Sequence, residues 1–345
     1  MTALLDRLPA LATTGIGSLP FDRASDAAQH SAADYDLPFC PQLPRVDGDM
    51  IAEWLGSDPG RCGWTPDRDR ERPSAWHDFV ARVRARPPAH GLVKLQVTGP
   101  VTLAMALERN GEGVPSRRRL TSLARDVATW LSANTAGQVR HLAETGLDVV
   151  LVVDEPGLAL SGVDPANQRL WDPLRVLVPA WGMHICGPVP WALVDSLDLD
   201  VLSLDLAAHG FADEGRPVLG RLLSRGGRVA WGVLDPVRPG SAAASAGLAV
   251  AALAEFSGGH LAPERTARQS LLTPSCGTGR LSVERELLVA ATLAATAQAA
   301  RGAVGAQPHR YRKAQQTADV LRRQKHSTSA KPARRSAASS SSSGK

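Results

Sequence analysis

The stretch Val149-Val150-Leu151-Val152-Val153 decides the fold of this 345-residue chain. It is entered from Asp148 and stopped by Asp154-Glu155-Pro156. A continuous apolar run between polar ends is typical of a parallel strand that is covered on both faces. Because parallel strands are joined by crossovers that usually contain a helix, the run indicates an α/β protein.

The alternation of strand and helix extends from this run toward both ends of the chain. Strands are expected over residues 13–18, 37–43, 92–97, 149–153, 181–186, 200–205, 228–234 and 270–276. Helices are expected over residues 22–35, 75–86, 100–107, 116–145, 165–178, 189–197, 215–224, 241–256 and 282–301. Eight strand candidates in about 300 residues predict a (β/α)8 TIM barrel over residues 1–302, with an open doubly wound sheet as the alternative.

The basic charge of the chain belongs to its last residues. Residues 301–345 hold 11 Lys and Arg against one acid, whereas residues 1–300 hold 28 basic and 33 acidic side chains. Residues 303–345, rich in Ser, Ala, Lys and Arg, have too few large apolar residues to fold and are predicted to be a disordered tail. A solubilising tail and a loose polyanion-binding tail both fit it. The body predicts no specific nucleic-acid surface.

The composition favours a cytoplasmic protein. The four cysteines are too few and too scattered for a disulfide framework. The N-terminus carries Asp6 and no long apolar run, which argues against a signal peptide. No stretch of about 18 uninterrupted apolar residues is present, so no membrane span is expected.

Polar residues stand at the ends of the predicted strands. These residues are Ser18, Asp154, Cys186, Asp205, Asp235 and Cys276. In a barrel the carboxyl ends of all strands open onto one face, where active sites lie. An acid at a strand end is often only a helix cap, but six such positions indicate a site.

A histidine and a cysteine on one strand point to a metal. In Met183-His184-Ile185-Cys186-Gly187 the side chains of His184 and Cys186 are two positions apart and share a face of the strand. Together with the distant Cys276 they form three ligands of a tetrahedral Zn²⁺ site with one open position, the catalytic kind. Ordinary core residues are the alternative interpretation.

Several short motifs together resemble the catalytic barrel of the cobalamin-independent methionine synthase family, within the superfamily that includes uroporphyrinogen decarboxylase. The motifs, in chain order, are Thr13-Thr14-Gly15-Ile16-Gly17-Ser18, Thr98-Gly99-Pro100-Val101-Thr102, Val153-Asp154-Glu155-Pro156, His184-Ile185-Cys186-Gly187 and Pro274-Ser275-Cys276-Gly277. The resemblance covers residues 12 to about 302.

The resemblance implies a zinc site and a substrate site. The zinc ligands would be His184, Cys186, Cys276 and Asp205, where the family usually has glutamate. The resemblance also implies that homocysteine binds with its carboxylate at Gly17 and Ser18 and its amino group at Asp154. Asp154 and Asp235 are the candidate catalytic acids.

The chemistry implied is methyl transfer to a thiol, homocysteine giving methionine. A free thiol is mostly protonated at neutral pH, and zinc removes the proton to leave a nucleophilic thiolate. The methyl donor would be methyltetrahydrofolate or a methylated corrinoid protein. The sequence lacks the family's tryptophan after Gly-Pro-Val-Thr and its histidine after the seventh-strand aspartate, here Asp235-Pro236-Val237-Arg238.

Three other functions stay open. They are a corrinoid-linked methyl or alkyl transferase with another thiol acceptor, a decarboxylase of the uroporphyrinogen type, and a metal-binding regulatory protein. The decarboxylase would need arginines near the first strand, for which Arg23 and Arg45 are candidates.

Overall fold

Seven parallel strands form one curled sheet in the computed structural model, which describes residues 2–56, 73–108, 116–257 and 262–305. The strands are β1 (Ala12–Thr13), β2 (Leu92–Thr98), β3 (Asp148–Asp154), β4 (Ala180–Ile185), β5 (Val201–Leu204), β6 (Arg228–Leu234) and β7 (Ser270–Pro274). Their order is β1-β7-β6-β5-β4-β3-β2. The run 149–153 thus lies in β3, paired on both sides, as its apolar pattern predicts.

The expected closed barrel of eight regular strands is not observed. The predicted second strand, residues 37–43, forms only isolated parallel bridges, Phe39 with Lys94 on one side and Gln42 with Ser18 on the other. Pro38 and Pro41 explain the difference, because proline has no N–H to donate to a strand ladder. The segment still lies between β1 and β2, the two edges of the sheet.

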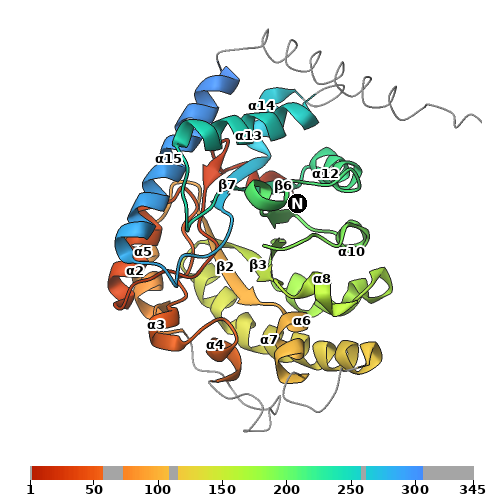
Figure 1. The fold of residues 1–345 in the computed structure, drawn as a ribbon. Coiled ribbons are helices and arrows are strands. Elements are labelled where there is room, and N and C mark those ends of the chain that lie inside the picture. Colours follow the sequence, from red (N-terminus) through yellow and green to blue (C-terminus); the bar gives the residue numbers. More distant parts are fainter. Residues whose placement is uncertain (1, 57–72, 109–115, 258–261, 306–345) are drawn as a thin grey trace, which may run out of the picture. The chain divides into compact units, whose positions relative to one another are not determined.

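Helices surround the outside of the sheet in Figure 1. They are α1 (Thr2–Leu5), α2 (Ala24–Asp34), α3 (Pro44–Asp47), α4 (Ala52–Leu55), α5 (Trp76–Ala85), α6 (Pro100–Glu108), α7 (Arg117–Glu144), α8 (Leu158–Ser161), the 3-10 helix η1 (Pro165–Trp171), α9 (Asp172–Arg175), α10 (Trp191–Ser196), α11 (Leu206–His209), α12 (Gly215–Ser224), α13 (Ala242–Phe256), α14 (Pro263–Arg268) and α15 (Val283–Gly305). Nearly all the predicted helices are present, but the one expected over 165–178 is the short pair η1 and α9.

Apolar side chains fill the interior of the sheet at the amino-terminal ends of the strands. Leu5 and Leu8, which precede β1, pack in one cluster with Val150, Ala180 and Val201. The candidate site residues Asp154, Cys186, Asp205 and Cys276 lie at the opposite, carboxyl-terminal ends of the strands.

Helix α15 covers the sheet beside α13, and both are rich in alanine. By length and composition α15 is also the one helix among the described residues that could cross a membrane, and 39% of its most apolar window is buried. Its buried positions, such as Val289, Leu293 and Ala297, recur every three to four residues. That spacing is typical of a helix packed on a protein core. The predicted tail, from residue 306 onward, lies outside the described residues.

Candidate active site at the carboxyl ends of the strands

One row of paired residues brings three of the polar side chains together. Asp154 on β3 pairs in register with His184 on β4, and His184 pairs with Ser203 on β5. Paired residues of parallel strands point to the same face. All three residues are at least nine-tenths buried. The sheet therefore sets a carboxylate, an imidazole and a hydroxyl side by side at its carboxyl-terminal end.

His184 has one partnered and one open ring nitrogen. Its Nδ1 lies 2.9 Å from Ser203 Oγ, while Nε2 is buried and has no hydrogen-bond partner among the described residues. Burial and then the nearby charge of Lys94 lower the pKa of His184 to about 3. The imidazole is therefore neutral at physiological pH, the form in which a ring nitrogen can bind a metal ion.

Cys186 and Cys276 touch although ninety positions separate them. Cys186 follows β4, Cys276 follows β7, and the two thiols lie close enough for each to shift the pKa of the other. Their interaction lowers the pKa of Cys276 to about 7 and raises that of Cys186. Cys276 is exposed and Cys186 is half-buried, so solvent reaches the pair.

These side chains are of the types that bind zinc, but they are not arranged as the ligands of a bound zinc ion would be. Within the described ranges, no three or more His, Cys, Asp or Glu side chains lie in an arrangement that could hold a metal ion. The open Nε2 of His184 and the two contacting thiols nevertheless fit the donor set that zinc prefers. Metal binding would require the side chains to rotate from the arrangement seen here.

Asp154 also has an open atom. Its Oδ1 is buried without a hydrogen-bond partner in the described part of the chain. Burial raises the pKa of Asp154, and the positive charge of Lys94 counteracts this shift. Burial lowers the pKa of Lys94 in turn. Asp154 is therefore a buried acid that keeps the capacity to accept a hydrogen bond from a ligand.

The turn Gly17–Ser18 lies against the loop that carries Cys276. The N–H and hydroxyl of Thr278 donate to the carbonyl of Ser18 over 3.0 and 3.2 Å. A Cβ atom at Gly277 would lie 2.1 Å from Ser18 Oγ, and one at Gly17 would lie 2.7 Å from the Gln96 side chain. A side chain at Gly277 would meet Ser18, so this glycine lets the Cys276 loop pack against the turn, whereas Gly17 is confined by the Gln96 side chain of β2.

The two remaining predicted residues have local partners. Asp205 caps α11 by accepting from the N–H of Ala208 over 2.8 Å, and its charge acts on Cys276, which places it beside the thiol pair. Asp235 accepts from the N–H of Val237 over 2.9 Å and lies 3.8 Å from Arg238. Both partners of Asp235 belong to its own loop. A catalytic role for Asp235 stays a prediction.

Glu155, next to Asp154, has a structural role. Its carboxylate accepts from the N–H groups of Val101 and Thr102, from the Thr102 hydroxyl and from Trp171 Nε1, all within 3.0 Å. It therefore ties the first turn of α6 to the end of β3, next to Asp154. A carboxylate at a helix N-terminus is favoured by the helix dipole.

Sequence reasoning missed two residues of the site, Lys94 and Ser203. The fully buried Lys94 donates from Nζ to the carbonyls of Gly15, over 2.9 Å, and of Ile16, in the segment that leads to Gly17. A lysine inside the apolar strand Leu92–Val97 was the available signal, because lysine is almost never buried without a partner.

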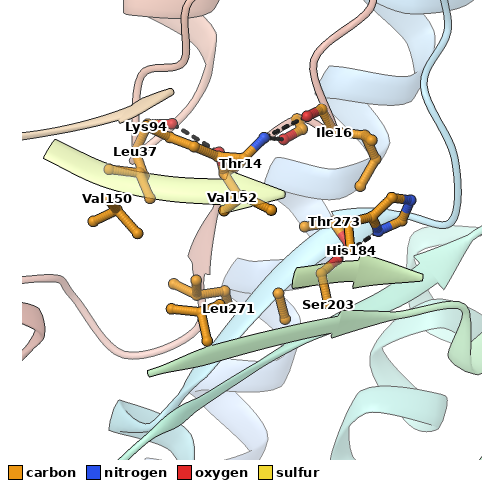
Figure 2. A pocket seen from close by; sticks show the side chains of 13 residues that line it. Thr14, Ile16, Leu37, Lys94, Val150, Val152, His184, Ser203, Leu271 and Thr273 are labelled. Carbon is orange, nitrogen blue, oxygen red and sulfur yellow. Dashed lines mark hydrogen bonds between the residues drawn. The ribbon is translucent and has the colours of Figure 1, made fainter. Parts of the chain in front are cut away.

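Lys94, His184 and Ser203 line the same internal cavity (Figure 2). The cavity leaves ≈ 20 Å³ for the centre of a water molecule, room for about one water. In Figure 2 the Lys94 side chain reaches the carbonyls of the segment that leads to Gly17. The second ring nitrogen of His184 lies on the side of the ring away from Ser203.

Comparison with known proteins supports the fold. No protein-family model matches this sequence, and no curated protein matches it. A solved structure of a methyltransferase from Methanosarcina mazei is similar over 86% of this chain and 97% of that protein, with a TM-score of 0.52 and 16% sequence identity. At this identity the likeness establishes a shared α/β fold, with helices around a parallel sheet. Membership of the methionine synthase family stays a prediction.

Proposed function

We propose that this protein is a zinc-dependent methyltransferase that moves a methyl group to a thiol, with homocysteine as the acceptor and methionine as the product. Two observations carry the proposal: the interaction between Cys186 and Cys276, and the open Nε2 of His184, which precedes Cys186 by two positions. The similar fold of a methyltransferase from Methanosarcina mazei is consistent with it.

Three residues would hold the metal, namely His184 through Nε2, Cys186 and Cys276. A bound zinc ion would supply Lewis acidity that lowers the pKa of a coordinated substrate thiol into the physiological range. Asp205 lies close enough for its charge to raise the pKa of Cys276, but one of its carboxylate oxygens already caps α11. If Asp205 does not bind the metal, the fourth coordination position of zinc stays open for an exchangeable substrate.

The rest of the site suits an amino acid. The unpartnered Oδ1 of Asp154 is an acceptor for an ammonium group, which would supply the hydrogen bond that this buried atom lacks. The turn Gly17–Ser18, packed against the Cys276 loop, is the site proposed for the carboxylate. Both charged ends of homocysteine would thus be bound beside the thiol pair.

The methyl donor is methyltetrahydrofolate or a methylated corrinoid protein. Either would approach the mouth of the sheet, which is the end formed by the carboxyl termini of the strands. The decarboxylase alternative receives less support. Its two candidate arginines form exposed ion pairs at the surface, Arg23 with Asp26 and Arg45 with Asp22. A decarboxylase would instead use such arginines to hold acidic groups of its substrate.

Metal analysis of purified protein tests the proposal. We expect one zinc per chain in the wild type, loss of zinc in Cys276→Ser, and no change in the matched control Cys40→Ala, because Cys40 is buried and takes no part in the thiol contact. Homocysteine should release about one proton per zinc-loaded site on binding. Unchanged zinc in Cys276→Ser would remove that residue from the site and defeat the proposal.

Turnover with each donor then separates the two methyl sources. Methyl transfer from methyltetrahydrofolate alone would show that the missing tryptophan and histidine are dispensable. Transfer only from a methylated cobalamin or corrinoid protein would assign the corrinoid donor. Zinc binding without homocysteine binding would instead support a metal-binding regulatory protein.

A further inference from the structure

Ser203 is the only residue that the described part of the structure gives as a hydrogen-bond partner of the His184 ring. The two residues are register partners on β5 and β4, and both are buried. Ser203 Oγ lies 2.9 Å from His184 Nδ1, as Figure 2 shows. A single neutral hydroxyl therefore governs the orientation of a buried imidazole.

The two ring nitrogens of a neutral histidine cannot do the same thing. One carries a proton and donates, and the other presents a lone pair and accepts. If the Ser203 hydroxyl donated to Nδ1, Nε2 would carry the proton and could bind no metal. If Nδ1–H donates to Ser203 Oγ, the lone pair of the open Nε2 is available.

We propose that Ser203 is a positioning residue that accepts a hydrogen bond from Nδ1–H of His184 and so holds Nε2 as a lone-pair donor for a divalent metal ion. The inference rests on the proposed zinc site and names the residue that prepares its histidine. Ser203 touches neither the substrate nor the metal, and acts through the imidazole.

A hydroxyl suits this position because of the charge at the site. Metal-binding histidines often donate their second nitrogen to a carboxylate, a carbonyl or water. Here two cysteinates would already balance the charge of Zn²⁺, and Asp154 is the register partner on the other side of His184. A serine fixes the ring without adding a further buried negative charge next to these groups.

Three variants test the inference. Ser203→Ala removes the acceptor, Ser203→Thr keeps it, and Thr273→Val removes a hydroxyl from the wall of the same cavity. Thr273 Oγ1 has no hydrogen-bond partner among the described residues, so its loss should leave His184 unchanged. Zinc affinity is measured by competition with a chromophoric chelator.

We expect Ser203→Ala to weaken zinc binding about 10- to 100-fold, the range for lost partners of metal-binding histidines, while Ser203→Thr and Thr273→Val bind zinc like the wild type. Equal affinity of Ser203→Ala and wild type would overturn the inference. If Ser203→Ala does not fold, Ser203→Thr decides instead. Loss of zinc affinity in Ser203→Thr would overturn the inference, because that variant keeps the hydroxyl.

A second readout needs no metal. In the metal-free wild type, the nitrogen chemical shifts of His184 should report a protonated Nδ1 and an unprotonated Nε2, and Ser203→Ala should give a mixture of tautomers. A protonated Nε2 in the wild type would overturn the inference. A wild type that binds no zinc but shows the expected tautomer would defeat the proposed function while sustaining the role of Ser203.

Discussion

Two buried histidines, His30 and His184, show how differently the fold treats the same side chain. His30 on α2 has both ring nitrogens on carboxylates, Nδ1 at 2.7 Å from Asp34 and Nε2 at 2.8 Å from Glu286 on α15. His184 has one nitrogen on a hydroxyl and the other on nothing among the described residues. His30 is 5% exposed and His184 is 4% exposed, so burial does not distinguish them.

The difference lies in what each histidine joins. His30 connects two outer helices through Glu286, which also accepts from the Tyr35 hydroxyl over 2.7 Å. Such a cluster stabilises packing between α2 and α15 and leaves the imidazole no capacity for a ligand. His184 connects two neighbouring strands and keeps an open nitrogen at the mouth. The open ring nitrogen, rather than burial, distinguishes His184 from His30.

Removing Glu286 should give the largest effect on stability. Glu286→Ala leaves the His30 imidazole and the Tyr35 hydroxyl buried without their shared acceptor, and breaking a buried charged pair in this way costs about 3–5 kcal/mol. Urea denaturation of the metal-free protein measures the loss, and zinc affinity should not change. A loss under about 1 kcal/mol would show that the cluster contributes little, and the contrast between the two histidines would fail.

The next largest effect is the acid sensitivity of His184 in the metal-free protein. Its folded-state pKa is about 3, below the value of about 6.5 in an unfolded chain. Between these values the unfolded state binds the extra proton, so stability falls by about 1.4 kcal/mol for each unit that the pH drops. From pH 6.5 to about pH 5 this amounts to about 2 kcal/mol.

His184→Leu supplies the control for this acid sensitivity. Without the imidazole, the part of the slope that belongs to His184 should disappear, and the variant should gain stability relative to the wild type as the pH falls. Stability should be compared by urea denaturation at both pH values in the presence of a chelator. Identical slopes for the two proteins would show that the His184 ring is not held neutral by its surroundings.

Two glycines, one from each region, give a smaller and opposite pair of effects. A Cβ atom at Gly277 would collide with Ser18 Oγ, so Gly277→Ala should cost about 1 kcal/mol as the serine rotates away. Gly302 on α15 has nothing within 4 Å of such an atom, and Gly302→Ala should stabilise the protein by about 0.5–1 kcal/mol through helix propensity. Thermal unfolding of both variants checks the signs, and a stabilising Gly277→Ala would contradict the close approach of the two mouth loops.

The sequence predicted which residues lie at the carboxyl-terminal end of the sheet better than it predicted the side chains that these residues contact. Apolar runs and the polar residues that end them predicted the parallel sheet and placed Asp154, His184 and Cys186 at one end. Cys276 follows β7 and meets Cys186, as the barrel hypothesis required. These features depend on patterns that are local in sequence and on the direction of parallel strands.

What the sequence did not predict depends on contacts across the fold. The role of Ser203 follows from its register with His184, and register between strands is not encoded by either strand alone. The segment 37–43 was expected as a strand, but its two prolines reduce it to isolated bridges. The pairing of His30 with Glu286 could not be predicted because Glu286 lies 256 positions away, whereas Asp34 lies only four positions along the same helix.

The smallest expected effect is the pH dependence of His30, and its sign is opposite to that of His184. Burial lowers the pKa of His30, but hydrogen bonds and attraction from Glu286 and Asp34 outweigh it, so the folded-state pKa lies above the unfolded value of about 6.5. Below pH 6.5 both states are protonated and the full stabilisation is present. As the pH rises through the folded-state pKa the folded protein loses its extra proton, and stability should fall. Urea denaturation of wild type and His30→Gln from about pH 6 to about pH 8 isolates this contribution, because groups that titrate in both proteins, such as Cys276 with its pKa of about 7, cancel in the difference. A difference in stability between the two proteins that stays constant or grows with pH would show that the carboxylates around His30 do not favour its charged form, and would remove the physical basis for separating it from His184.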